Sequence, residues 1–169
     1  MRQIKINSTT GSEIVTTSEF KSYARVNYSD DDTMIGKMLV QARIWCENYI
    51  SRDIVAKNRT YYLDETNGVF DLPFGPVASI SSVTIDGVAN TDYTTPGLDN
   101  ETIDIDGYGD KVKVTYITTG LDDNLLQQAI LQLALTYYDN RHDYEIGKAV
   151  NEVPTSVKNI LSSFKNMFI

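Results

Sequence analysis

The chain has 169 residues, 41% of them hydrophobic and 22% charged, which suits one folded domain and excludes a disordered protein. Its 15 basic and 23 acidic residues give a formal net charge of -8, which argues against binding nucleic acid through a basic face. The single Cys46 leaves no intrachain disulfide and no cysteine-rich zinc site. Because the sequence shows no signal-peptide core and no apolar run of about 18 residues, we expect a soluble protein without a membrane span.

Residues 1–16 predict an N-terminal arm or an edge strand. The run Arg2–Ile6 alternates between polar and apolar residues, and a segment rich in Ser and Thr follows it. A short helix is then expected, capped by Thr17 or Ser18 and continuing to Val26.

A second helix is predicted to begin at Asp30–Asp32 and to run to about Ile50. The aspartates supply a cap and place negative charge at the positive end of the helix dipole. Apolar side chains recur three and four residues apart along this helix, at Ile35, Met38, Leu39, Ala42, Trp45, Cys46 and Tyr49. This spacing forms one stripe, so we expect Trp45 and Cys46 to belong to the core and not to a ligand or nucleophile site.

The middle of the chain, from about residue 59 to 119, predicts an inserted antiparallel β region. Short alternating runs occur at 59–63, 69–72, 80–85, 102–105 and 111–117. The dipeptides between them are typical of turns, namely Asn67-Gly68, Asp86-Gly87, Pro96-Gly97 and Asp106-Gly107. Two prolines exclude the segment 72–77 from a paired strand, so we expect an edge crossing or an exposed loop there, with Phe74 as a candidate contact residue.

A third helix is predicted after the caps Asp122 and Asp123. One face carries Leu126, Ala129, Ile130, Leu133 and Tyr137. Leu125 and Leu135 lie outside this face and widen the apolar arc, so we expect another subunit to bury them. Tyr138 follows Tyr137, and in such a pair one ring can face the core while the other reaches an interface.

The C-terminal segment predicts a last amphipathic helix over about 154–168. Pro154 and Thr155 favour its start, and its apolar positions are Val157, Ile160, Leu161, Phe164, Met167 and Phe168. Met167, Phe168 and Ile169 make an apolar terminus that should dock on another surface. The fold class expected from all elements is α+β, a small bundle of three to four helices with an inserted antiparallel β region.

Nothing in the sequence forms a recognisable catalytic, cofactor or metal motif. The sole histidine, His142, has no partner motif for catalysis and fits a helix end. The segment Asp104–Asp110 faintly resembles a calcium loop, but it lacks the ligand spacing and terminal Glu of an EF-hand, and a hairpin turn explains it better. We therefore expect no enzyme activity, no cofactor and no metal.

The order of the elements resembles the head-tail connector, or DNA-packaging adaptor, family of tailed bacteriophages. The resemblance covers residues 17–169, taken as a single connector-like domain after the arm 1–16. It rests on five segments in order: Glu47–Arg52, Leu72-Pro73 with Pro76–Val83, Thr115-Tyr116, Gly120 and Tyr137–Arg141. The arm and the longer 99–110 hairpin depart from the family pattern.

The resemblance implies a structural protein of the virion neck that assembles in the host cytoplasm. Such proteins form a homo-oligomeric ring, usually of twelve subunits, between the portal protein and the next neck or tail protein. During packaging and genome ejection DNA passes through the channel without specific binding. The candidate interface residues are Leu125, Leu135, Tyr138, Arg141, Phe74, Met167, Phe168 and Ile169. The alternatives are another neck or tail-completion protein, or a small calcium-binding module built on Asp104, Asp106 and Asp110.

Overall fold

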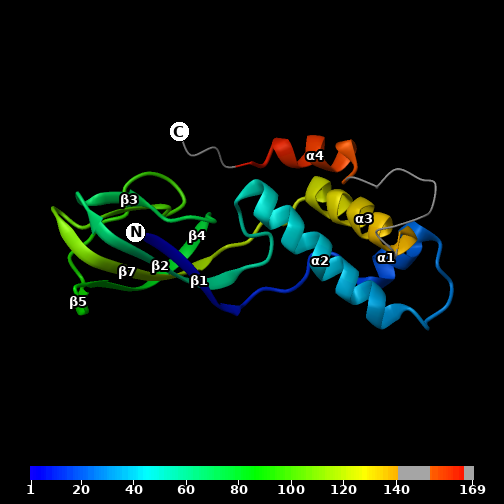
Figure 1. The fold of residues 1–169 in the computed structure, drawn as a ribbon, viewed down its shortest axis with the longest axis horizontal. Helices are drawn as coiled ribbons and strands as arrows, with labels where there is room; N and C mark the ends of the chain where they lie inside the picture. The colour runs from blue at the N-terminus through cyan, green and yellow to red at the C-terminus, as the bar shows by residue number, and fades with distance from the viewer. Residues whose placement is uncertain (141–152, 166–169) are drawn as a thin grey trace. The chain divides into compact units, whose positions relative to one another are not determined.

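A computed structural model of the chain describes residues 1–140 and 153–165 (Figure 1). The chain divides into two compact units. Residues 1–12 and 52–121 form a β unit, and residues 13–51 and 122–169 form a helical unit. The predicted α+β fold class is confirmed, because the helices gather in one unit and the antiparallel strands in the other. Arg141 and His142, and also Met167, Phe168 and Ile169, lie outside the described residues.

The described part of the helical unit contains α1 (Thr17–Ala24), α2 (Asp32–Ile50), α3 (Asn124–Asp139) and α4 (Thr155–Ser162). The cap of α1 is Thr16, one residue before the predicted position. Its hydroxyl accepts a hydrogen bond from the backbone N–H of Glu19, whose carboxylate accepts from the backbone N–H of Thr16. This capping box satisfies two N–H groups at once and fixes where the helix begins.

The acidic run before α2 acts differently from the prediction. Asp31 occupies the cap position, but its side chain makes no capping hydrogen bond. Its carboxylate accepts instead from the hydroxyl of Tyr138 on α3 at 2.7 Å. The negative charge still lies beside the first turn of α2, where it favours the helix dipole.

The core of the helical unit follows the predicted stripes. Fully or nearly fully buried apolar side chains come from all four helices, and include Phe20, Ile35, Leu39, Cys46, Leu126, Ile130, Leu133, Val157 and Leu161. Cys46 is therefore core, as predicted. Trp45 is only half-buried at the margin of the stripe, where its ring stacks on Tyr49 with 5.2 Å between centroids.

The β unit is built on a five-stranded antiparallel sheet in the order β1-β2-β7-β4-β5. Its strands are β1 (Arg2–Thr9), β2 (Lys57–Thr66), β7 (Gly109–Thr118), β4 (Val77–Ile85) and β5 (Val88–Asn90). A smaller sheet pairs β3 (Val69–Asp71) with β6 (Thr102–Asp104). The core of the unit takes apolar side chains from both sheets, including Tyr61, Leu63, Val83, Ile103, Val112, Val114 and Tyr116.

Glycine turns set the hairpins of the β unit. Asp86 and Gly87 have φ of 49° and 82° between the paired residues Ile85 and Val88, which is the two-residue turn that matches strand twist. The sequence did not predict the short β5 that this turn produces. Gly120, at φ 80°, follows β7, and a Cβ there would lie 2.8 Å from a backbone oxygen of Ile54, so only glycine fits.

The proline-rich segment 72–77 is less exposed than predicted. Leu72 and Val77 at its ends are 1% and 3% exposed and belong to the core, and Val77 already begins β4. The residues between them are half-buried or buried, so the expectation of an exposed loop was wrong for most of the segment.

Candidate interface surfaces

Leu125 lies at the start of α3 with its side chain 48% exposed, outside the buried face formed by Leu126, Ala129, Ile130 and Leu133. Asp123 caps the helix there by accepting from the backbone N–H of Leu125 at 2.7 Å. Leu135, further along the same helix, is half-buried within the chain itself. Of the two leucines predicted as contacts, Leu125 therefore presents the larger free apolar surface.

Tyr138 takes part in a hydrogen-bonded cluster inside the helical unit. Its hydroxyl donates to Asp31 and lies 2.6 Å from the hydroxyl of Tyr28, and its ring packs edge-on against Phe20. Hydrogen bonds to Tyr28 and Asp31 raise the pKa of Tyr138 above the usual range of tyrosine. The cluster ties the turn before α2 to the end of α3, so much of the polar end of Tyr138 is already used.

Phe74 is held inside the β unit by a buried cation. The guanidinium of Arg59 lies 3.9 Å from the centre of the Phe74 ring, a cation–π contact, and the backbone oxygen of Phe74 accepts from the N–H of Asp53. The φ of Phe74 is 66°, a strained value for a bulky residue. A partner would therefore meet only part of this half-buried ring.

Beside Phe74 lies a buried charge cluster that the sequence analysis missed. Asp53 is fully buried, and it accepts from Lys57 at 2.8 Å, from Arg59 at 2.7 and 2.6 Å, and from Thr118 at 2.9 Å. Burial would raise the pKa of Asp53, but the hydrogen bonds and charges of Arg59 and Lys57 outweigh it and hold that pKa below its usual value. The Asp53 carboxylate is buried and already hydrogen-bonded within the chain. This arrangement is typical of a group that stabilises the fold and not of a catalytic group.

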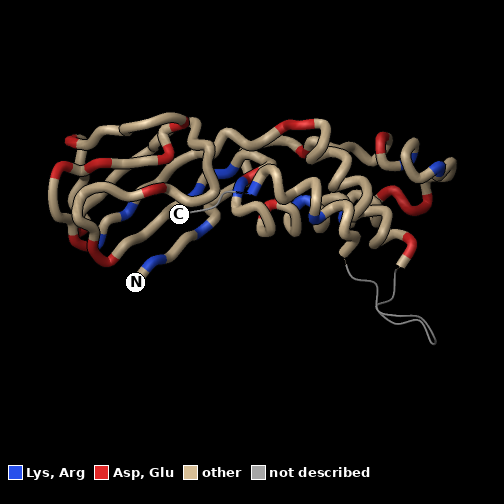
Figure 2. Tube along the Cα trace, turned by 90° about the horizontal axis from the view of Figure 1, so that it is seen from above, with Lys and Arg blue, Asp and Glu red and all other residues tan. Residues whose placement is uncertain are grey.

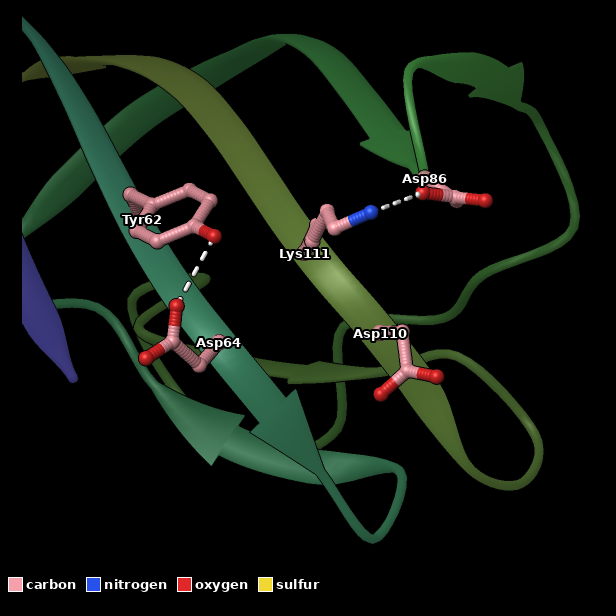
Figure 3. A pocket seen from close by; sticks show the side chains of 5 residues that line it. All are labelled: Tyr62, Asp64, Asp86, Asp110 and Lys111. Carbon is pink, nitrogen blue, oxygen red and sulfur yellow. Dashed lines mark hydrogen bonds and ion pairs between the residues drawn. The ribbon is translucent and has the colours of Figure 1, made fainter.

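A shallow pocket of 370 Å³ on the β unit is lined by Tyr62, Asp64, Asp86, Asp110 and Lys111 (Figure 3). Figure 3 shows Lys111 donating to Asp86 and Tyr62 donating to Asp64, both at 2.9 Å. The residues that line it include no cysteine, histidine or serine that could act as a nucleophile or base. Four of its five polar side chains are paired with each other, and Asp110 accepts a hydrogen bond from Tyr108 outside the pocket.

The segment Asp104–Asp110 connects β6 of the small sheet to β7 of the large sheet, and because these two strands do not pair with each other, the predicted hairpin turn was wrong. Asp104 accepts from the backbone N–H of Asp106, and Asp110 accepts from the hydroxyl of Tyr108. Across residues 1–140 and 153–165, no three His, Cys, Asp or Glu side chains converge as a metal site would require. In the same ranges no helix is long and apolar enough to cross a membrane.

The edges of the large sheet carry exposed apolar side chains that the sequence analysis also missed. Ile4 and Ile6 on β1 are 40% and 50% exposed, and Val88 on β5 is 70% exposed. The expectation of an edge strand within residues 1–16 is confirmed by β1, and the sheet order adds that Val88 lies at the opposite edge.

Comparisons with known proteins add a fold likeness over the whole chain. No protein-family model matches it, and no curated protein does. A chain from the neck of an empty gene transfer agent particle, computed with C6 symmetry, has a TM-score of 0.76 at 18% identity, covering 99% of this chain and 97% of that one. Chains from the virion of a native gene transfer agent particle and from its neck, computed with C12 symmetry, have TM-scores of 0.76 and 0.72 at 16% identity, with the same coverage. This protein therefore has the fold of those chains, with both of its units included.

Proposed function

We propose that this protein is a structural, non-enzymatic component of the neck of a phage-like particle. One observation carries the proposal: the fold likeness covers 99% of this chain and 97% of a chain from a particle neck, so it extends over both the β unit and the helical unit. The ordered segments from Glu47–Arg52 to Tyr137–Arg141, whose order resembles that of the connector family, agree with the same function. The buried charges and the polar side chains of the pocket form hydrogen bonds within the chain, which agrees with a structural role.

More specifically, we propose a ring that joins the portal vertex of the DNA-filled head to the tail and surrounds the DNA channel. The C6 and C12 symmetries in which the similar necks were computed favour rotational copies, with twelve as the expected number. A closed ring needs two different contact patches on each copy. The formal charge of -8 suits a channel through which DNA passes without binding.

Leu125 is the helical residue best placed to contact a neighbouring subunit, because its apolar side chain is exposed at a capped helix start. Leu135, Tyr138 and Phe74 contribute less, since their own chain covers part of each. We keep Arg141 and the terminal residues 167–169 as proposed contacts toward the portal or the next neck protein.

The proposal is tested by measuring the mass of the purified chain by native mass spectrometry, and its shape by electron microscopy, alone and with the portal ring of the same particle. We expect a ring on the portal. Leu125→Asp should prevent it while leaving the circular dichroism spectrum unchanged, and Ile44→Asp, at a similarly exposed position on α2, should leave assembly intact. Failure to bind the portal would refute the connector role, and binding only to a later neck protein would favour a tail-completion role.

A further inference from the structure

The face of the large sheet that forms the apolar core is exposed where it reaches β1. The pairing places Ile4, Tyr61, Val114 and Val83 in one row across β1, β2, β7 and β4, all on the same face of the sheet. Val83 is 2% exposed, Val114 0% and Tyr61 8%, but Ile4 is 40% exposed. Three residues of this row are therefore buried in the core, and the fourth, Ile4 at the edge of the sheet, is exposed.

The opposite edge shows the same feature on the same face. Val88 of β5 pairs with Ile85, which lies two residues from the core residue Val83 and so points to the same side. Val88 is 70% exposed, and Ile6, two residues from Ile4, is 50% exposed. Both ends of the sheet thus carry exposed apolar side chains on the core face, and a second sheet continued from either edge would place them side by side and remove part of their exposed apolar surface.

The main chain of β1 is ready to accept a strand. Asp64 donates its N–H to the oxygen of Met1, and antiparallel pairs alternate, so Arg2, Ile4 and Ile6 direct their N–H and C=O groups away from β2. The register is regular from Arg2 to Ile6, with the single irregularity of β1 falling between Ile6 and Ser8. Such a regular edge without proline is a template for pairing with another chain.

Charge distinguishes the possible partners of this edge. The segment 1–12 carries Arg2 and Lys5 and no acidic residue, whereas no Lys or Arg occurs between residues 60 and 110, where Asp and Glu recur. Figure 2 shows the basic residues on the N-terminal strand and the acidic ones at the turns of the β unit. Asp86 and Asp92 flank β5 closely. Two β1 edges would bring like charges together, while β1 against β5 brings opposite ones together.

We propose that β1 of one copy pairs with the β5 edge of the next copy, so that the β units supply a subunit contact of the ring in addition to the helical contact at Leu125. The inference rests on the proposed ring function, and it supplies the two different patches that a closed ring requires. Ile4 and Ile6 of one copy then lie beside Val88 of the next on a continuous core face. The contact is head-to-tail, and every copy uses both edges.

The test is a disulfide between Ile6→Cys and Val88→Cys in the full chain, co-expressed with its portal protein and oxidised. Within one copy these positions are four strand spacings apart, about 19 Å, far beyond the roughly 7 Å that a disulfide permits. Cys46 is buried and does not compete, because burial raises the pKa of its thiol to about 12.

We expect the double variant to give a ladder of covalent multimers, and a mixture of the two single variants to give dimers only. Dimers of Ile6→Cys alone, or a ring on the portal without any ladder, would overturn the β-edge contact and leave the proposed function standing. A chain that neither binds the portal nor cross-links would overturn both.

A backbone substitution provides an independent test. Ile4→Pro removes an N–H that faces away from β2, so the urea midpoint of the chain should stay near that of the native protein while ring formation falls at least tenfold. Lys5→Pro removes an N–H that faces β2 and should lower the midpoint, which shows that the assay detects loss of β1 pairing. Normal ring formation by a folded Ile4→Pro variant would contradict the inference.

Discussion

Asp53→Asn is the most direct test of how the β unit is stabilised. The substitution keeps the size of the side chain and removes the negative charge that faces Lys57 and Arg59, which are 3% and 4% exposed. Breaking a buried ion pair by removing one partner costs about 3–5 kcal/mol, because the remaining charge loses its compensation in a buried site. With a urea slope of about 1–3 kcal/mol per molar, the unfolding midpoint should fall by about 1 M or more.

The matched control is Asp86→Asn, which alters a pair of the same chemistry at the surface. Asp86 and Lys111 lie 2.9 Å apart, but their side chains are 66% and 67% exposed. Asn tolerates the positive φ of 49° at this position, so the backbone is not perturbed. We expect no measurable change in midpoint, since exposed pairs contribute little. The measurement is circular dichroism across a urea titration, and equal midpoints for the two variants would refute the argument.

The same carboxylate predicts a pH dependence. The pKa of Asp53 is lower in the folded chain than in the unfolded one, so the unfolded chain takes up the proton first as pH falls. The stabilisation is complete above the usual Asp pKa of about 3.9 and is lost as pH falls through the folded value. The native chain should therefore lose stability over this window more steeply than Asp53→Asn, and parallel curves would contradict the assignment.

Three further predictions concern other parts of the chain. Cys46 should resist a thiol reagent at pH 8 and react only in denaturant, because burial raises its pKa to about 12; rapid labelling of the folded chain would oppose this. Leu133→Ala should cost about 2–5 kcal/mol of unfolding free energy, while Leu125→Ala on the same helix should change it by less than about 0.5 kcal/mol, as measured by urea unfolding. Calcium titrated calorimetrically should give no binding heat, since the carboxylates of Asp104 and Asp110 are used in local hydrogen bonds.

Local signals predicted where the helices begin to within one or two residues, but the last helix was predicted too long, since α4 ends at Ser162 and not near residue 168. The end of α2 at Ile50 was correct, but of its predicted stripe only Ile35, Leu39, Ala42 and Cys46 are buried, while Met38, Trp45 and Tyr49 are half-buried. The buried face of α3 was correct at Leu126, Ala129, Ile130 and Leu133, and Tyr137 is half-buried. The caps were less certain, because Asp, Ser and Thr occur side by side before α1 and α2. Which of them accepts an N–H depends on tertiary partners, such as the tyrosine hydroxyl that binds Asp31.

The arrangement of the strands could not be obtained in the same way. The alternation of polar and apolar residues located β2, β4 and β7. It did not show which strands pair, and β1 pairs with β2 although the two are distant in the sequence. Such pairing leaves no local mark in the sequence. The short β5 was missed because Ala and Asn, which are depleted in strands, make up two of its three residues, whereas the equally short β3 and β6 lie in the predicted runs 69–72 and 102–105.

The buried charges were missed for a different reason, because a signal was present. Lys57 and Arg59 continue the alternation of Tyr61 and Leu63, so they belong to the buried face of β2 by period alone. Charged residues are seldom placed in a core without a partner, and the partner Asp53 lies just before the strand. If the two-residue period of β2 is extended to charged residues as well, it predicts that Lys57 and Arg59 are buried.

The proposed ring predicts how the protein meets DNA. If β1 of each copy lies against an acidic β5 edge, Arg2 and Lys5 are neutralised at the contact and the ring exposes mainly acidic side chains. Duplex DNA should then pass without adhering, because a surface with a net negative charge repels the phosphate backbone.

The measurement is a gel-shift titration of the assembled ring with duplex DNA at about 50 mM and 200 mM salt. We expect no shifted band at either concentration for the native ring. Binding of the native ring that weakens steeply with salt would mean that basic side chains line the channel, and the acidic-lumen argument would then be wrong.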